Sequence, residues 1–183
     1  GFMAEEKRRI GRAAAALVAP GESIFIDGGT TTMEVARALP ANFPVTVVTN
    51  AMNVALELSA KGIPVHVTGG ALREATLSLV GPAAVQSLGG MAFNRAFLGT
   101  SGVTVRHGFN NSNVDETEIK RMAIRQSAET NIVMDHTKFG ASFLFSFAPL
   151  GGVRRIVTDR MPDEEWNAAL AEHEVEVLAA DAG

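Results

Sequence analysis

The stretch Ile24-Phe25-Ile26-Asp27-Gly28-Gly29-Thr30-Thr31-Thr32 decides the fold of this chain. Its apolar beginning predicts a buried strand over residues 23–26. Residues 33–39 have apolar side chains at helical spacing and are followed by a proline, so they predict a helix that starts just after the glycines. A strand that turns into a helix in this way presents free N–H groups and the positive end of the helix dipole at one point. Such a turn favours an anion, most naturally a phosphate.

The three threonines have a second interpretation. Thr is also a common N-cap and Gly-Gly a common turn, and these residues would then serve only to start the helix. Neither the dinucleotide fingerprint nor the Walker A pattern is present, and no Lys follows the glycines. A nucleotide is therefore less favoured than a smaller phosphorylated ligand.

Composition restricts the class of protein. The chain has 183 residues, 46% of them hydrophobic, which suits one domain or a domain with a small lobe. Its 16 Lys and Arg against 20 Asp and Glu give a net charge of -4, so this chain alone is not expected to bind a nucleic-acid backbone. It has no Cys, and its four His lack metal-ligand spacing, so we expect no metal and no cofactor. The sequence contains no apolar run of membrane-spanning length, and we expect a cytoplasmic protein.

Strand and helix signals alternate along the chain. Strands are predicted over residues 45–49, 63–68, 96–100, 131–135, 153–158 and 175–178, and helices over 5–18, 51–60, 83–88 and 162–170. Lys7, Arg8, Arg9 and Arg12 give the first helix a basic face, which we interpret as solvated. The order predicts an α/β fold with a Rossmann-like, mostly parallel sheet, helices on both faces and a possible small lobe.

Polar or glycine-rich turns follow several of these strands. Asp27-Gly28-Gly29, Asn50 and Gly69-Gly70 end the first three strands, and Lys138 lies just beyond the strand over 131–135. Because the carboxyl ends of parallel strands meet at one edge of a sheet, we expect these residues to lie near one ligand. Lys138 would then act as a point charge for a phosphate or carboxylate.

The region after residue 105 gives two further patterns. The polar stretch 106–113 has the composition of a mobile loop over a site. Phe143, Phe145 and Phe147 alternate, which predicts that they share one face of a strand, in the core or at a subunit interface. An exposed aromatic stripe favours a homodimer or homotetramer.

A helix is predicted to start at Asp115. Glu118 follows three residues later, which is a capping-box pattern. Glu116 and Lys120 would then lie one turn apart on this helix, either as an exposed ion pair or as part of the pocket.

Many of these stretches together resemble the effector-sensing domain of DeoR-family transcriptional repressors. The resemblance covers about residues 5–160 and rests on residues 24–31, 48–50, 68–70 with Arg73, 78–81, 96–99, Glu116 with Lys120, 134–140 and 156–159. Asn94 departs from it, since the family usually has Asp there. The resemblance implies a fold similar to ribose-5-phosphate isomerase and the CoA transferases. It also implies a winged helix-turn-helix DNA-binding domain before the sensor domain of residues 5–183, with residues 1–4 as a cut end or cloning remnant.

The resemblance implies that a phosphorylated sugar or polyol binds and modulates operator binding by the DNA-binding domain. Residue by residue, it assigns the phosphate to Thr30, Thr31 and Thr32 beside Gly28 and Gly29, the crevice to Asp27 and Asn50, close backbone approach to Gly69 and Gly70, the positive charge to Lys138 and a hydroxyl acceptor to Glu116, with Thr100 and Ser101 as further candidates.

Two other functions stay open. A sugar-phosphate isomerase on the same fold would use Glu116 and Lys138 as base and electrophile. However, the turn over residues 96–102 has no acid where the isomerase pattern has acidic residues, so we expect no catalytic residues and no enzyme. A module that serves only assembly is the third possibility.

Overall fold

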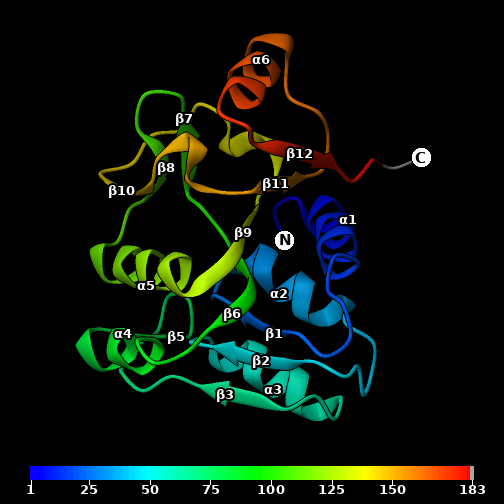
Figure 1. Cartoon of the computed structure of the whole chain (residues 1–183), viewed down its shortest axis with the longest axis vertical. Helices are drawn as coiled ribbons and strands as arrows, with labels where there is room; N and C mark the ends of the chain where they lie inside the picture. The colour runs from blue at the N-terminus through cyan, green and yellow to red at the C-terminus, as the bar shows by residue number, and fades with distance from the viewer. Residues whose placement is uncertain (182–183) are drawn as a thin grey trace.

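The framework of the protein is a seven-stranded parallel sheet in the order β12-β11-β9-β6-β1-β2-β3 (Figure 1). Its strands are β1 (Ser23–Ile26), β2 (Thr46–Thr49), β3 (Val65–Val67), β6 (Phe93–Leu98), β9 (Ser127–Val133), β11 (Arg155–Thr158) and β12 (Glu176–Ala179). This computed structural model describes residues 1–181, and the last two residues of the predicted domain 5–183 lie outside that range. The predicted α/β class and parallel sheet are confirmed.

Helices cover both faces of this sheet. One face packs against α1 (Ala4–Ala15), α2 (Thr30–Ala38) and α3 (Met52–Ala60), and the other against α4 (Pro82–Leu88), α5 (Val114–Gln126) and α6 (Glu164–Glu172). Successive side chains of a strand point to opposite faces, so Ile24 and Ile26 pack with the first set of helices and Phe25 with the second. All three side chains are fully buried, and each contributes about 1.5–3 kcal/mol to stability.

Two small antiparallel sheets extend from the framework. β4 (Ala71–Arg73) and β5 (Ser78–Val80) form a hairpin, and β7 (Gly102–Thr104), β8 (Gly108–Asn111) and β10 (Phe145–Ala148) form a three-stranded sheet. We call the three-stranded sheet the small lobe. Among the described residues, no helix has both the length and the apolar character that a membrane crossing needs.

The prediction of a mobile loop over residues 106–113 is wrong, because β8 lies within it and all four of its residues are buried. Its Gly and Asn residues serve close packing. A Cβ atom on Gly108 would lie 2.1 Å from the carbonyl oxygen of Ala148, and the Asn110 side chain donates to the Ala141 carbonyl at 3.0 Å. Gly and Asn, which are typical of loops, here allow β8 to pack tightly on the segment around β10.

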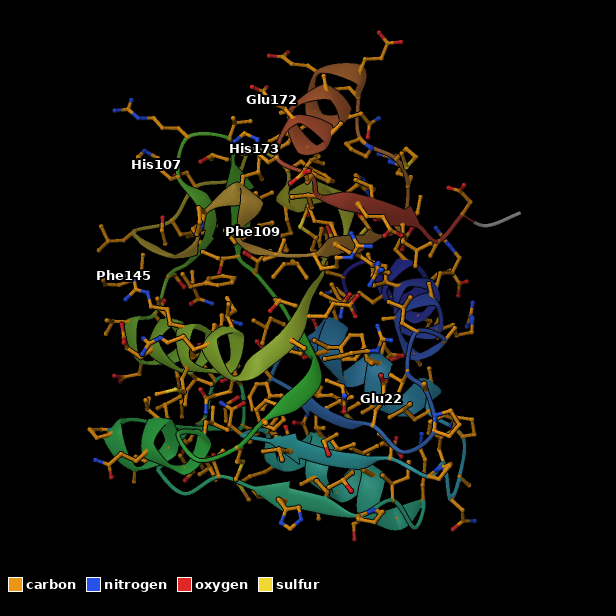
Figure 2. The ribbon with its side chains drawn as sticks, in the orientation of Figure 1. Glu22, His107, Phe109, Phe145, Glu172 and His173 are labelled. Carbon is orange, nitrogen blue, oxygen red and sulfur yellow. The ribbon has the colours of Figure 1, made fainter. Side chains whose placement is uncertain are left out.

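The prediction that three phenylalanines share one strand face is also wrong. Phe143 precedes β10 and is 48% exposed, whereas Phe147 is buried against Phe109 with ring centroids 6.2 Å apart. Figure 2 shows Phe109 in the interior and Phe145 at the outer side of the small lobe. A register shift in the pairing of β10 with β8 further interrupts the regular alternation.

Two helix ends differ from prediction. The N-cap of α5 is Asn113, whose side chain accepts a hydrogen bond from the Glu116 N–H at 3.0 Å, so Asp115 lies inside the first turn. Helix α1 ends at Ala15, because residues 16–18 form turns instead of a further helical turn. The remaining predicted elements are present, with their ends shifted by a few residues.

The first and last elements of the fold meet. Nε of Arg9, on α1, donates to the carbonyl oxygen of Ala180, just after β12, at 2.9 Å. Helix α1 also contacts β9 and β11, so its position depends on strands that lie late in the sequence.

Candidate anion-binding site

A cavity of about 380 Å³ lies at the carboxyl ends of β1, β6 and β9. Most residues predicted for the site line it: Gly28, Gly29, Thr30, Thr31, Thr32, Thr100, Ser101, Glu116 and Lys138. They come from the start of α2, the loop after β6, helix α5 and the short 3₁₀ helix η1 (His136–Lys138). The sheet thus gathers at one edge residues that are up to about a hundred positions apart in sequence.

The first turn of α2 offers unpaired N–H groups to this cavity. Gly29 is the N-cap, and its φ of 147° is a conformation that other residues rarely adopt. None of the three threonines caps the helix: the Thr32 hydroxyl instead donates to the Gly29 carbonyl at 3.1 Å. Within residues 1–181, the N–H groups of Thr30, Thr31 and Thr32 donate to no other group. With the helix dipole behind them, they suit an anion.

Two lysines from distant elements lie beside this turn. Nζ of Lys7, on α1, donates to Oγ1 of Thr30 at 2.9 Å, and Nζ of Lys138 lies 3.8 Å from Oδ2 of the fully buried Asp135. Burial lowers the pKa of Lys7 from its ordinary value; Asp135 opposes this change and the like charge of Lys138 adds to it. Two ammonium groups therefore depend on one carboxylate, which leaves positive charge for a ligand.

A second charged group forms around Asp27, which is buried and does not line the cavity. Its carboxylate contacts Nζ of Lys120, a residue that does line it, and accepts the Gly99 N–H at 3.1 Å. Lys120 also donates to the Gly99 carbonyl at 2.9 Å. Burial raises the pKa of the Asp27 carboxyl, while Lys120 and the Gly99 N–H oppose that rise. Asp27 thus positions Lys120 and the loop after β6.

Of the two interpretations of Glu116 and Lys120, the exposed ion pair is wrong, because each residue has another partner. Oε2 of Glu116 lies 3.0 Å from Nη1 of Arg73, which extends from the β4–β5 hairpin to α5. Lys120 pairs with Asp27 instead. Glu116 and Lys120 both line the cavity, so the interpretation that they belong to a pocket, and not to an exposed surface, agrees with the structure.

Asn50, Gly69 and Gly70 lie outside the cavity lining and stabilise the hairpin region. The Asn50 side chain donates to the Leu79 carbonyl at 3.0 Å, and the Asn50 backbone carbonyl accepts the Leu79 N–H at 2.7 Å. Gly70 has φ 125°, and a Cβ atom there would lie 2.6 Å from the Val80 carbonyl oxygen. The N–H of Gly69 donates to Ser87. These residues follow the outer strands β2 and β3, whereas the cavity lies over β1, β6 and β9.

The structure adds lining residues that the sequence prediction missed: Lys7, Arg73, Thr76, Asn111, Ser112 and Phe143. Lys7 had been interpreted as part of a solvated basic face, and Asn111 as part of a loop. Their elements reach the cavity through tertiary contacts, for which no local pattern exists. Across residues 1–181, no three His, Asp or Glu side chains are grouped as metal ligands.

Comparison with known proteins relates this chain to transcriptional regulators. The model of a family described as the DeoR C terminal sensor domain matches residues 3–160. The HTH-type transcriptional regulator GlpR of Haloferax volcanii is 37% identical over 88% of this chain and 63% of its own length. The HTH-type transcriptional repressor GlcR of Bacillus subtilis is 31% identical over 98% and 69%, and the glycerol-3-phosphate regulon repressor of Escherichia coli 30% identical over 94% and 69%. This chain spans about two thirds of the length of these relatives.

Solved structures agree on the fold. Ribose 5-phosphate isomerase A from Neisseria gonorrhoeae superimposes with a TM-score of 0.56 and 16% identity over 76% of this chain and 55% of that one. eIF2B beta from Chaetomium thermophilum gives a TM-score of 0.60 and 14% identity over 92% and 53%. The isomerase-like fold is confirmed; at these identities the likeness extends to the fold alone.

Proposed function

Because this chain belongs to the family of DeoR C-terminal sensor domains, we propose that it is the effector-sensing part of a cytoplasmic transcriptional repressor. Its effector would be a phosphorylated sugar or polyol, which binds the cavity and changes how an attached DNA-binding domain contacts an operator. The observation that carries this proposal is the first turn of α2, whose unpaired N–H groups lie beside Lys7 and Lys138. The relatives' names, which include a transcriptional repressor and a glycerol-3-phosphate regulon repressor, support it.

The charges of the cavity favour a ligand with a single phosphate. Lys7 and Lys138 have only Asp135 as a common counter-charge, and a phosphate monoester would supply the negative charge that is missing there. By contrast, Arg73 and Lys120 each have a carboxylate partner of their own. A second phosphate at those residues would have to displace Glu116 or Asp27, so a bisphosphate is disfavoured.

The remainder of the ligand would be hydroxylated. Glu116, Asn111 and Ser112 line the cavity from α5, β8 and the segment between them, and they offer both donors and acceptors. The charged groups around the cavity form two sets. Asp135 and Lys138 act on Lys7, whereas Lys120 and Glu116 act on Asp27. A cavity of about 380 Å³ lies within the range of small-ligand sites, about 300–1,000 Å³.

We propose further that the chain is not an enzyme, although the isomerase fold makes aldose–ketose interconversion the alternative. The candidate base Glu116 is held by Arg73, and the relatives are named as regulators. Incubating the chain with ribose 5-phosphate and following the sugar by NMR tests this directly. Appearance of ribulose 5-phosphate above the rate without protein would favour the isomerase.

We also propose a homodimer or homotetramer. Phe143 and Leu144, adjacent in the segment before β10, are 48% and 83% exposed, and such apolar side chains favour burial by a second copy. Sedimentation equilibrium of the chain gives the mass directly. A monomer across the concentration range would contradict this part of the proposal and leave the ligand site unaffected.

The ligand itself can be tested by thermal shift and calorimetry with sugars and polyols, each paired with its phosphate. Binding to the folded state raises stability by RT ln(1 + [L]/Kd), about 2.7 kcal/mol at a hundredfold excess over Kd. We expect shifts with one or a few phosphates and none with the free sugars. Lys138→Met should weaken binding about tenfold, and Arg125→Met, an exposed cation outside the cavity, should not. No binding across the panel, or equal binding of sugars and phosphates, would overturn the proposal.

A further inference from the structure

Helix α1 lies directly on α2, the helix whose first turn lines the cavity. Their backbones are in close contact at Gly11, where a Cβ atom would lie 2.4 Å from the carbonyl oxygen of Glu34. Ile10 and Ala14 of α1 are fully buried on either side of this contact. A small change in how α1 packs would therefore be felt at α2, because the contact has no spare volume.

One side chain connects α1 to the cavity. Among the residues of α1, Lys7 alone lines it, and Nζ of Lys7 donates to Oγ1 of Thr30 at the first position of α2. The ring of Phe2 lies on Lys7, with Nζ 5.6 Å from the ring centroid. The segment that leads into α1 is thus packed beside the ligand cavity, and Figure 1 shows the N-terminus near α1 and α2.

An anion in the cavity would change the charges around Lys7. Asp135 attracts Lys7 and Lys138 repels it, and burial disfavours the charged form of Lys7. Oδ2 of Asp135 accepts no hydrogen bond from any described residue. A phosphate at the α2 turn would attract Lys7 and Lys138 together, so the contact of Lys7 with the site is stronger with ligand than without it.

We infer that Lys7 makes α1 part of the effector site, so that bound phosphate holds α1 on α2 and restricts the polypeptide that leads into α1. This inference rests on the proposed function, since it requires a phosphate at the α2 turn. It gives the regulation a physical route: in a C-terminal sensor domain, the remainder of the regulator is joined through the segment before α1. The coupling free energy is the difference between the free energies with which α1 packs on α2 in the presence and in the absence of bound phosphate.

Hydrogen exchange of the α1 amides with inorganic phosphate as the probe tests this inference. Residues 4–15 are followed with and without saturating phosphate, against chloride at the same ionic strength, and phosphate affinity is measured by calorimetry. In the unmodified chain, we expect phosphate to slow exchange in α1 by about tenfold. Arg12→Met changes one exposed charge on the same helix outside the cavity and should preserve both the affinity and the slowing.

Three substitutions separate the possible results. Lys7→Met should weaken phosphate binding about tenfold and remove the slowing in α1 even at saturation. Lys138→Met should also weaken binding, but should keep the slowing at saturation, because Lys7 is present. Lys7→Arg should retain the slowing, since it keeps the charge, which excludes a mere folding defect of the Met variant.

The failure of this inference differs from the failure of the proposed function. If phosphate binds, Lys138→Met weakens it, and Lys7→Met still shows slowed exchange in α1, the inference is overturned and the phosphate site stands. If neither inorganic phosphate nor any phosphorylated sugar binds the unmodified chain, the proposed function fails, and the inference fails with it.

Discussion

Nζ of Lys120 contacts the carboxylate of Asp27, 93 residues earlier in the chain, and the two side chains are only 5% and 4% exposed. The pair joins α5 to the loop after β1 and, through the Gly99 N–H, to the loop after β6. Two charges removed from water in this way are costly unless each satisfies the other. The loops around the cavity are therefore held by an interaction that tolerates no single replacement.

Breaking this pair should destabilise the chain. We expect Lys120→Met to lower the free energy of unfolding by about 3–5 kcal/mol, because Asp27 is then buried without its counter-charge. The double variant with Asp27→Asn should lose less than the sum of the two single losses. Urea unfolding measures all three. Arg125→Met replaces an exposed cation on the same helix and should cost less than about 1 kcal/mol; an equal loss in Lys120→Met and Arg125→Met would contradict this explanation.

Asp159 should make stability depend on pH in the acid range. Its carboxylate is 2% exposed; burial alone would raise its pKa, but the His136 ring at 2.7 Å and the His136 N–H outweigh this, so the pKa lies below its ordinary value of 3.8. The unfolded chain then takes up the proton at a higher pH than the folded chain. The free energy of unfolding is accordingly lost as pH falls below about 4.

Asp159→Asn removes this contribution, so its unfolding free energy should fall less steeply between about pH 5 and 3 than that of the unmodified chain. Denaturant titrations at several pH values give both slopes. Asp27, whose pKa is raised, contributes a slope of the opposite sign, but it is the same in both proteins. Parallel slopes would show that Asp159 does not carry the effect.

Gly69 and Gly70 provide a matched pair of substitutions. Gly70→Ala should cost about 2–3 kcal/mol, because φ is positive there and the new Cβ atom would overlap the Val80 backbone. At Gly69 the nearest atom would be 3.7 Å away, so Gly69→Ala should change stability by less than about 0.5 kcal/mol. Neither change should alter ligand affinity in the folded fraction. If Gly69→Ala loses ligand affinity but not stability, Gly69 and Gly70 do belong to the ligand site.

Arg73 should distinguish the hydroxylated part of the effector from its phosphate. Arg73→Met leaves Glu116 without its partner and changes the side of the cavity assigned to hydroxyl groups. We expect about tenfold weaker binding of the phosphorylated sugar or polyol that gives the largest thermal shift, with inorganic phosphate changed by no more than about twofold. Calorimetry with both ligands makes the comparison. Equal losses would place Arg73 at the phosphate instead.

The sequence was sufficient to predict the turn before α2, because the pattern that specifies it is local. A strand, two glycines and a helix follow one another there, and the cavity forms around them. Lys7 could not be predicted to line the cavity in the same way, because it reaches Thr30 across 23 residues through the packing of two helices.

The start of α5 shows a different limit of prediction from the sequence. Asn113 with Glu116 and Asp115 with Glu118 both fit a capping box, and the choice depends on which helical face is buried, including Ile119 and Lys120.

The hydrogen bond from Arg9 to the carbonyl of Ala180 has a consequence for the order of synthesis. A ribosome delivers residue 180 more than 170 residues after Arg9, so the helix that carries Lys7 waits for nearly the whole sensor domain before this contact can form. Fragments released before β12, by interrupted translation or by a protease, lack this anchor of α1. A nascent sensor domain would therefore not yet be able to regulate through α1. A sensor domain that a protease has cut before β12 would have lost this ability.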